Sequence, residues 1–271
     1  MCQEKRSGAA SNSAEEIFQL LEKLPFAVIS LIEVKKRKGK PMRFGRSAAV
    51  LLPLVTICIF AATADAKSME LETRLLECTA TLEDIMQAPD KGIPIDLIKR
   101  SKAIIIFPSL LKAGFGVGGH YGKGVILRRN QSGGKWGPPA FISLIGGSFG
   151  WQLGLQSTEM VLLVMTEISL KSLFRDKLTI GADASIAAGP IGRDASAGLE
   201  VDRGAGILSY SRAKGLFAGV SIKGSVLEPD WDANQQYYGS DVSIIDIFFH
   251  SKGSVSRAGK RLIQLLNRYG A

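Results

Sequence analysis

The sequence predicts an α+β domain in which a glycine-rich antiparallel β core, barrel-like or sandwich-like, carries helices at its N- and C-terminal ends. Most of the 30 glycines lie between residues 114 and 224 among alternating apolar residues, which favours strands that approach closely and turn sharply. Two other segments, 68–86 and 254–269, have apolar residues at helical spacing. Because 46% of the residues are hydrophobic and 22% are charged, the chain can bury a sizeable core.

The first predicted helix covers residues 68–86. Its apolar side chains recur at spacings of three and four, on one helical face; they are Leu71, Leu75, Cys78, Leu82 and Ile85. Pro94 then opens a short helix that extends to Lys102, since proline suits the first helical turn. The continuous run AIIIF at 103–107 predicts a buried strand that Pro108 stops.

Alternating and apolar segments predict the remaining strands, and glycine pairs predict the turns between them. We expect an alternating segment at 113–127, a turn at 130–134, and strands at 140–145 and 148–155 that Gly146 and Gly147 join. An apolar strand or buried helix at 160–166 and a short helix at 169–174 follow. We then expect alternating segments at 178–188 and 195–201 around a turn at 189–192, a strand pair at 206–212 and 215–226, and a C-terminal helix at 254–269. No repeat or second boundary interrupts residues 67–271, which are predicted to form one domain.

Residues 42–66 have the pattern of a secretory signal peptide. Arg43 and Arg46 form a basic start, residues 48–62 are almost wholly apolar, and residues 64–66 match an A-x-A cleavage site. We therefore predict an exported protein, periplasmic or secreted, whose mature part begins at Lys67. The alternative is a retained membrane anchor, although the apolar run is shorter than the roughly 20 residues that span a bilayer.

An export signal normally begins a chain, yet residues 1–41 precede this one. Our hypothesis is that translation starts at Met42 and that residues 1–41 are an upstream extension. The alternative is a long, genuine N-terminal region that contains the basic run at 35–38.

The net charge of +9 favours anionic partners, such as phospholipid headgroups or nucleic acid, without choosing between them. No recognised nucleic-acid module and no interleaving of aromatic and basic residues is present, so we expect no nucleic-acid partner. Of the three cysteines, only Cys78 follows the predicted cleavage site, and its place on the apolar stripe predicts core packing. Since the two histidines are far apart in sequence, we expect neither a transition-metal cluster nor a cofactor.

Two glycine motifs resemble catalytic or cofactor-binding signatures. Residues 114–119 match GxGxxG, but the following HYGKG is a poor helix start, so we interpret the motif as β-strand and not as a dinucleotide site. Residues 146–150 match the GxSxG nucleophile elbow, with Asp246 and His250 downstream of Ser148 in hydrolase order. An elbow must lead into a helix, whereas residues 151–155 alternate like a strand. A serine hydrolase that uses Ser148 is therefore an alternative and not the main prediction.

The C-terminal helix has an apolar stripe and an opposite basic side. This pattern fits docking on an anionic membrane, and it equally fits a helix that packs on the β core with a solvated basic face. We predict lipid contacts at two cationic groups, near the first strand and on this helix, with the glycine-rich surface between two further lysines as the next place to look. These candidate residues are Lys99, Arg100, Lys102, Lys112, Lys123, Arg257, Lys260, Arg261 and Arg268.

The mature chain resembles the SYLF domain family in a series of stretches between about residues 93 and 239. Their order and spacing carry the resemblance. They are AIIIFP at 103–108, KAGFGVGG at 112–119, GVILR at 124–128, WGPPAF at 136–141, GPIGR at 189–193, SYS at 209–211, KGLFAG at 214–219 and NQQYYG at 234–239. Many members have Ser after the Trp, where this chain has Gly137.

The resemblance implies a phospholipid-binding domain without a catalytic reaction, of a family found in bacterial exported proteins and in eukaryotic membrane-trafficking and actin-patch proteins. An amphipathic segment before the conserved region contacts membranes in eukaryotic members, but the corresponding residues 68–86 are acidic here. We therefore predict an exported, non-enzymatic protein that associates with anionic phospholipid membranes. A structural cell-envelope protein is a further alternative, and the sequence identifies no protein partner.

Overall fold

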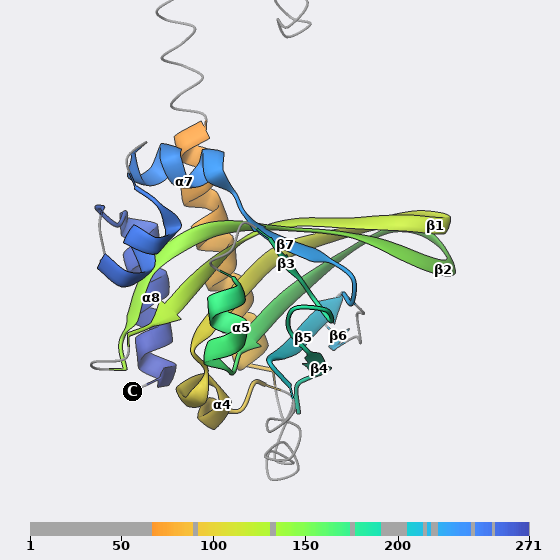
Figure 1. Ribbon diagram of the computed structural model, residues 1–271, viewed down its shortest axis with the longest axis horizontal. Coiled ribbons are helices and arrows are strands. Elements are labelled where there is room, and N and C mark those ends of the chain that lie inside the picture. Colours follow the sequence, from red (N-terminus) through yellow and green to blue (C-terminus); the bar gives the residue numbers. More distant parts are fainter. Residues whose placement is uncertain are drawn as a thin grey trace, which may run out of the picture. The chain divides into compact units, whose positions relative to one another are not determined.

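The computed structural model describes residues 67–88, 92–130, 134–173, 177–190, 205–213, 216–217, 222–239, 242–250 and 253–270 (Figure 1). The chain divides into Met1–Ile59 and Phe60–Ala271, and all described residues lie in the second unit. The predicted extension at 1–41, the signal segment at 42–66 and the strand at 195–201 lie outside the described residues.

Two helices precede the sheet, as predicted. The first helix covers residues 67–86, and its apolar stripe faces the core: Leu75, Cys78 and Leu82 are completely buried. The second helix, α4 (Ile95–Arg100), follows Pro94, and it buries Leu97 and Ile98. Cys78 packs in the core, as its place on the stripe predicts.

A long antiparallel ribbon forms the centre of the sheet. Strands β1 (Ala103–Arg129, 27 residues) and β2 (Trp136–Val164, 29 residues) pair from one end to the other, with register shifts that include one between Gly114 and Gly116. The ribbon bends back on itself, so that Gly122 and Gly124 lie against residues 106–110 of the same strand (Figure 1). A Cβ at Gly124 would overlap a carbonyl oxygen and an aromatic ring there, so glycine permits the close crossing.

Two predicted breaks in this ribbon are wrong. Pro108 does not stop β1, because the strand passes it through a register shift between Phe107 and Leu110. Gly146 and Gly147 do not turn the chain either, since both lie within β2 and pair with His120 and Gly119. A Cβ at Gly146 would overlap the His120 ring, so this glycine provides space for a neighbouring side chain.

Five further strands complete a seven-stranded sheet. They are β3 (Leu178–Thr179), β4 (Ile186–Ala188), β5 (Ile207–Ala213), β6 (Leu216–Phe217) and β7 (Val226–Pro229). Strands β7 and β5 both pair with β2, at residues 142–145 and 159–164. The predicted segment 178–188 is divided by a turn that includes Gly181, with φ of +91°. The sheet is antiparallel as predicted, except that β4 pairs in parallel with β5.

Four helical segments lie among and after the strands: α5 (Glu167–Ser172), α7 (Trp231–Tyr238), the single π-helical turn η2 (Asp246–His250) and α8 (Arg257–Gly270). The first and last of these confirm predicted helices. The sequence pattern does not predict α7 or η2.

The sheet is buried on both faces along the first part of β1. Ile104 and Ile106 join a core with the first helix and α8, whereas Ile105 and Phe107 join a second core with α5 and η2. Because successive strand residues point to opposite faces, burial of both faces explains the continuous apolar run AIIIF. No described helix is both long and apolar enough to cross a membrane.

Candidate functional site

The two predicted cationic groups lie on neighbouring helices. Helices α4 and α8 pack against each other, although they are far apart in sequence. The apolar stripe of α8, which includes Leu262, Leu265 and Leu266, is buried in the core, so this stripe is not available to enter a bilayer. The exposed side chains that remain form what we call the cationic helical face: Lys99 and Arg100 on α4, and Arg257, Lys260, Arg261 and Arg268 on α8.

Arg129 holds this helix pair on the end of the ribbon. Its Nη2 donates to the carbonyl oxygen of Ile98 at 2.8 Å, and its Nη1 donates to that of Gly270 at 3.3 Å. A cation at the C-terminal ends of two helices is favoured by their dipoles. The Arg129 guanidinium also lies 4.6 Å from the Trp136 ring centroid, and burial lowers its pKa. Part-buried contacts of Arg129 therefore fix the orientation of the cationic helical face.

The other three predicted lipid-binding residues do not belong to this face. Lys102 pairs with Glu167 at 3.8 Å, and Lys123 pairs with Glu70 at 3.7 Å. Lys112 is half-buried on β1, where its charge contributes to lowering the pKa of His120. The predicted set thus separates into a six-residue face and three cations elsewhere.

A groove lies between the first helix and β1. It has a volume of about 570 Å³ and is lined mainly by apolar surface, which includes Met69, Leu111 and Tyr121. These three side chains are 70%, 44% and 44% exposed, high values for large apolar groups. The groove also borders Lys123, one of the predicted residues.

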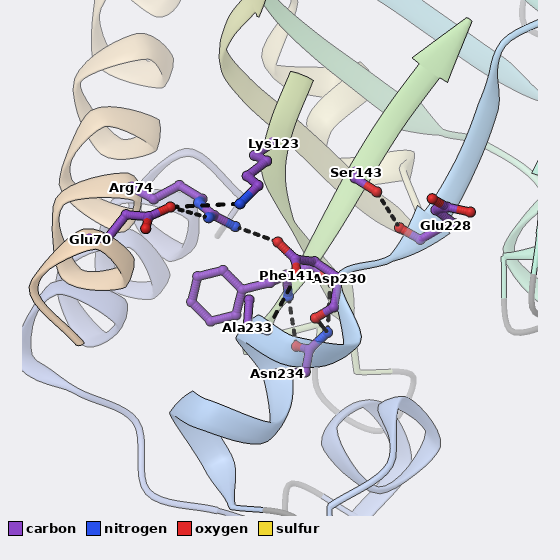
Figure 2. Close-up of polar contacts among 9 residues, drawn as sticks. All are labelled: Glu70, Arg74, Lys123, Phe141, Ser143, Glu228, Asp230, Ala233 and Asn234. Atoms are coloured by element: carbon purple, nitrogen blue, oxygen red, sulfur yellow. Dashed lines mark hydrogen bonds and ion pairs between the residues drawn. The ribbon is translucent and has the colours of Figure 1, made fainter. Parts of the chain in front are cut away.

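Glu70, Arg74 and Lys123, which line the groove, belong to a part-buried ion-pair network (Figure 2). Arg74 is only 5% exposed, and its guanidinium bonds Glu70 and Asp230, each at 3.0 Å. Asp230 also accepts from the backbone N–H of Ala233 as the N-cap of α7. Asn234 of that helix exchanges two 2.8 Å hydrogen bonds with the backbone of Phe141 on β2.

The charges in this network compensate each other. Glu70 and Asp230 face Arg74, and Glu70 also faces Lys123. The positive charges in the groove are therefore balanced by carboxylates, whereas an anionic headgroup is attracted to an excess of positive charge. The sequence carried a signal for Arg74, because it lies at helical spacing among Leu71, Leu75 and Cys78.

The backbone around Ser148 does not form a nucleophile elbow. Ser148 pairs with Gly118 inside β2, in a strand that continues to Val164, and its side chain lies outside the described part of the chain. An elbow requires a strand that turns directly into a helix. The acid in the proposed triad, Asp246, accepts a 2.8 Å hydrogen bond from the Ser243 hydroxyl. The GxGxxG segment is likewise β-strand, as predicted.

A buried histidine and serine were not singled out by the sequence. His120 Nε2 lies 2.6 Å from Ser225 Oγ, and that hydroxyl also lies 2.5 Å from the carbonyl oxygen of Ile222. A serine whose one proton points at a carbonyl accepts from the imidazole, so this arrangement does not activate the hydroxyl as a nucleophile. Burial, with a contribution from Lys112, lowers the pKa of His120. Among the described residues, no cluster of His, Cys, Asp and Glu could hold a metal ion.

Comparisons with known proteins agree with the resemblance in the sequence. A family described as "Ysc84: Las17-binding protein actin regulator" matches residues 145–269. LAS seventeen-binding protein 3 of Saccharomyces cerevisiae is 38% identical over 155 residues, which cover 56% of this chain and 33% of that protein. SH3 domain-containing YSC84-like protein 1 of Rattus norvegicus is 30% identical over 182 residues, which cover 67% of this chain and 53% of the relative.

The bent ribbon and its helices define an α+β domain that presents a cationic helical face and a groove. The chain belongs to the Ysc84/SYLF family. It spans between a third and about half of the length of these curated relatives.

Proposed function

We propose that this protein is a non-catalytic binding protein that associates with anionic phospholipid membranes through the cationic helical face. The observation that carries the proposal is the packing of α4 against α8, which unites exposed Lys and Arg residues from both ends of the domain. Because the apolar stripe of α8 is buried, the attraction is electrostatic and needs no insertion of this helix.

The test removes charge from α8 without changing its fold. In the triple variant Lys260→Gln, Arg261→Gln and Arg268→Gln, the changed side chains are exposed and Gln retains helix propensity. Each cation near an anionic bilayer contributes about 1 kcal/mol, so affinity for anionic liposomes should fall by about two powers of ten. Neutral liposomes should bind weakly in every case.

A matched control changes the same net charge elsewhere. Lys171, Lys177 and Lys223 are exposed and lie outside the two helices, so their replacement by Gln should reduce binding much less. Raising the salt concentration should weaken wild-type binding, because the screening length falls to below about 10 Å. Equal binding by the wild type and the α8 variant at low salt would exclude this face.

The non-catalytic part of the proposal rests on the strand geometry at Ser148 and has its own test. An activated serine reacts with a fluorophosphonate probe. We expect the wild type and a Ser148→Ala variant to give the same labelling, because Ser148 does not react. Specific labelling at Ser148 would instead establish the hydrolase alternative.

We also propose that the protein is exported by the signal at 42–66 and acts in the periplasm or outside the cell. The support is the order of basic start, apolar run and A-x-A site. N-terminal sequencing of the purified protein should give Lys67 as the first residue. A chain that retains residues 42–66 would favour the membrane anchor, and peptides from residues 1–41 would contradict the Met42 start.

A protein partner is a second candidate function, supported by the groove and by the names of the relatives. The groove has exposed apolar side chains and balanced charge, which suit a protein surface more than an anionic headgroup. The matching family is described as Las17-binding. If the groove serves this role, Leu111→Ser and Tyr121→Ser should abolish binding to purified Las17 while liposome binding is retained.

A further inference from the structure

Arg128 is a buried cation that the cationic helical face does not use. It lies at a register shift near the end of β1, and its side chain contacts η2, whereas that of Arg129 contacts α4 and α8. Its residue exposure is 7%, and its guanidinium lies 4.1 Å from the ring centroid of Phe249. Nη1 donates to the carbonyl oxygen of Phe248 at 3.1 Å, whereas Nε is buried and has no hydrogen-bond partner.

Among the described residues, Arg74 and Arg212 face carboxylates, whereas Arg128 and Arg129 do not, and each of these two has a buried Nε without a hydrogen-bond partner. Arg74 faces two carboxylates, Arg212 bonds Glu159 and Asp84, and Arg129 lies among helix carbonyls. Within the described residues, Arg128 has only one carbonyl and one aromatic ring as partners. A buried charge without an opposite charge is costly, so an external anion at this position would stabilise the fold.

The free edge of the guanidinium is the one that suits an oxyanion. Nε and Nη2 form a planar fork that binds two oxygens of a phosphate at once. Within the described residues Nη2 makes no hydrogen bond, and it is not among the buried unpartnered atoms, whereas Nε is buried, so an incoming oxyanion meets Nη2 first. The Phe249 ring, which is 48% exposed, lies over the same group.

The surface beside this fork is apolar. Ile245 and Phe249 are four residues apart, and each is 48% exposed. Asp246, which lies between them, bonds Ser243. An anion that binds at Arg128 therefore meets the exposed Phe249 ring, and Ile245 lies four residues before that ring on the same helical segment.

We infer that Arg128, with Phe249 and Ile245, forms a phosphate-binding site distinct from the cationic helical face. The shared chemistry is a phosphate group, supplied by a phospholipid headgroup or by free phosphate. The apolar flank favours the phospholipid, and that choice of source rests on the proposed function.

Thermal unfolding of the full chain in inorganic phosphate tests the site without membranes. At equal ionic strength in chloride, a phosphate concentration ten times the dissociation constant should raise the midpoint by about 3 to 6 °C. Arg128→Lys keeps the charge but loses the fork, so it should show a clearly smaller shift. Arg128→Met should show none, while Lys171→Arg, an exposed change on α5 that keeps the charge, should respond like the wild type.

The results that overturn the inference are equally specific. A wild-type midpoint that does not respond to phosphate, or an equal response in wild type and Arg128→Lys, removes the site. If Arg128→Met does not fold, the phosphate response of the Arg128→Lys variant alone decides whether the site exists. An equal shift from acetate at the same concentration would show a general anion effect and also reject a phosphate site.

The two sources of phosphate are separated by a short-chain, soluble phosphatidic acid. With a lipid site, this lipid should act at lower concentration than inorganic phosphate, and Ile245→Ser should remove that advantage without changing the phosphate response. Equal potency of the two would assign the site to free phosphate. The α8 triple Gln variant should retain the shift of the thermal midpoint in phosphate while it loses binding to anionic liposomes. The two measurements therefore test the Arg128 site and the cationic helical face separately.

Discussion

Asp230 connects charge compensation with the start of a helix. Its carboxylate faces the buried Arg74 and also caps α7 through the backbone N–H of Ala233. Glu70 faces the same arginine, but its side chain is 58% exposed and such pairs contribute less than about 1 kcal/mol. The Asp230 carboxylate, at 14% exposure, therefore provides most of the compensation for Arg74.

Asp230→Asn tests this compensation because Asn can still accept the capping hydrogen bond. We expect the free energy of unfolding to fall by about 3 kcal/mol, since Arg74 remains buried with only an exposed partner. Urea unfolding measures this loss. Asp232→Asn, an exposed change in the same helical turn, should stay within about 0.5 kcal/mol. Similar losses in the two variants would show that the ion pair is not the cause.

His120 should make the stability depend on pH. Because its folded pKa lies below the ordinary value of 6.5, the unfolded chain binds more protons in the interval between the two values. The free energy of unfolding should therefore decrease as the pH falls below about 6.5. Denaturation series between about pH 5 and 7.5 should show this slope in the wild type and a weaker slope in His120→Gln. His250→Gln is the control, and loss of the slope there instead would contradict the assignment.

Within the bent β1–β2 ribbon, close contact with neighbouring residues requires glycine at some positions and not at others. Gly124 lies against Ile106 and Phe107, whereas a Cβ at Gly147 would meet no atom within 4 Å. Gly124→Ala should lower the free energy of unfolding by about 1 to 3 kcal/mol through overpacking. Gly147→Ala should be neutral or slightly stabilising, because strand glycine has an entropic cost. Thermal or urea unfolding of both variants checks the difference, and equal effects would show that the crossing does not depend on Gly124.

The sequence predicted elements whose pattern is local. The first helix and α8 each carry an apolar stripe at helical spacing, and both stripes face the same core. The continuity of β2 was missed because Gly146 provides space for His120, a residue distant in sequence, and no local pattern contains that contact. Helix α7 was missed because Asp230 was not recognised as its cap and the helix has few buried residues, such as Ala233.

The candidate site shows the same division between local and long-range information. The basic side of α8 could be predicted from the helical spacing of its apolar and basic residues alone. The contact between α4 and α8 could not be predicted, because it depends on the ribbon that holds both helices through Arg129. Arg128 could not be distinguished from Arg129 by sequence, since only the fold shows that Arg129 bonds α4 and α8 whereas Arg128 bonds η2.

At the scale of the whole molecule, both cores are formed by residues between Leu71 and Leu266. A chain that begins at Lys67 therefore contains all the described packing. We expect it to unfold in one cooperative transition and to bind anionic liposomes as the full chain does. A multi-step transition in urea, followed by two spectroscopic probes, would show that the predicted boundary is wrong.

A chain that begins at Gln87 should not fold, because it lacks the first helix. That helix buries Leu71, Leu75, Leu82 and Ile85 at 0 to 4% exposure. At about 1.5 to 3 kcal/mol for each buried side chain, their loss removes about 6 to 12 kcal/mol. This amount is similar to the whole stability of a typical domain, about 5 to 15 kcal/mol. Circular dichroism and urea titration measure the outcome, and a cooperative transition in the shorter chain would show that the sheet and α8 are stable without the first helix.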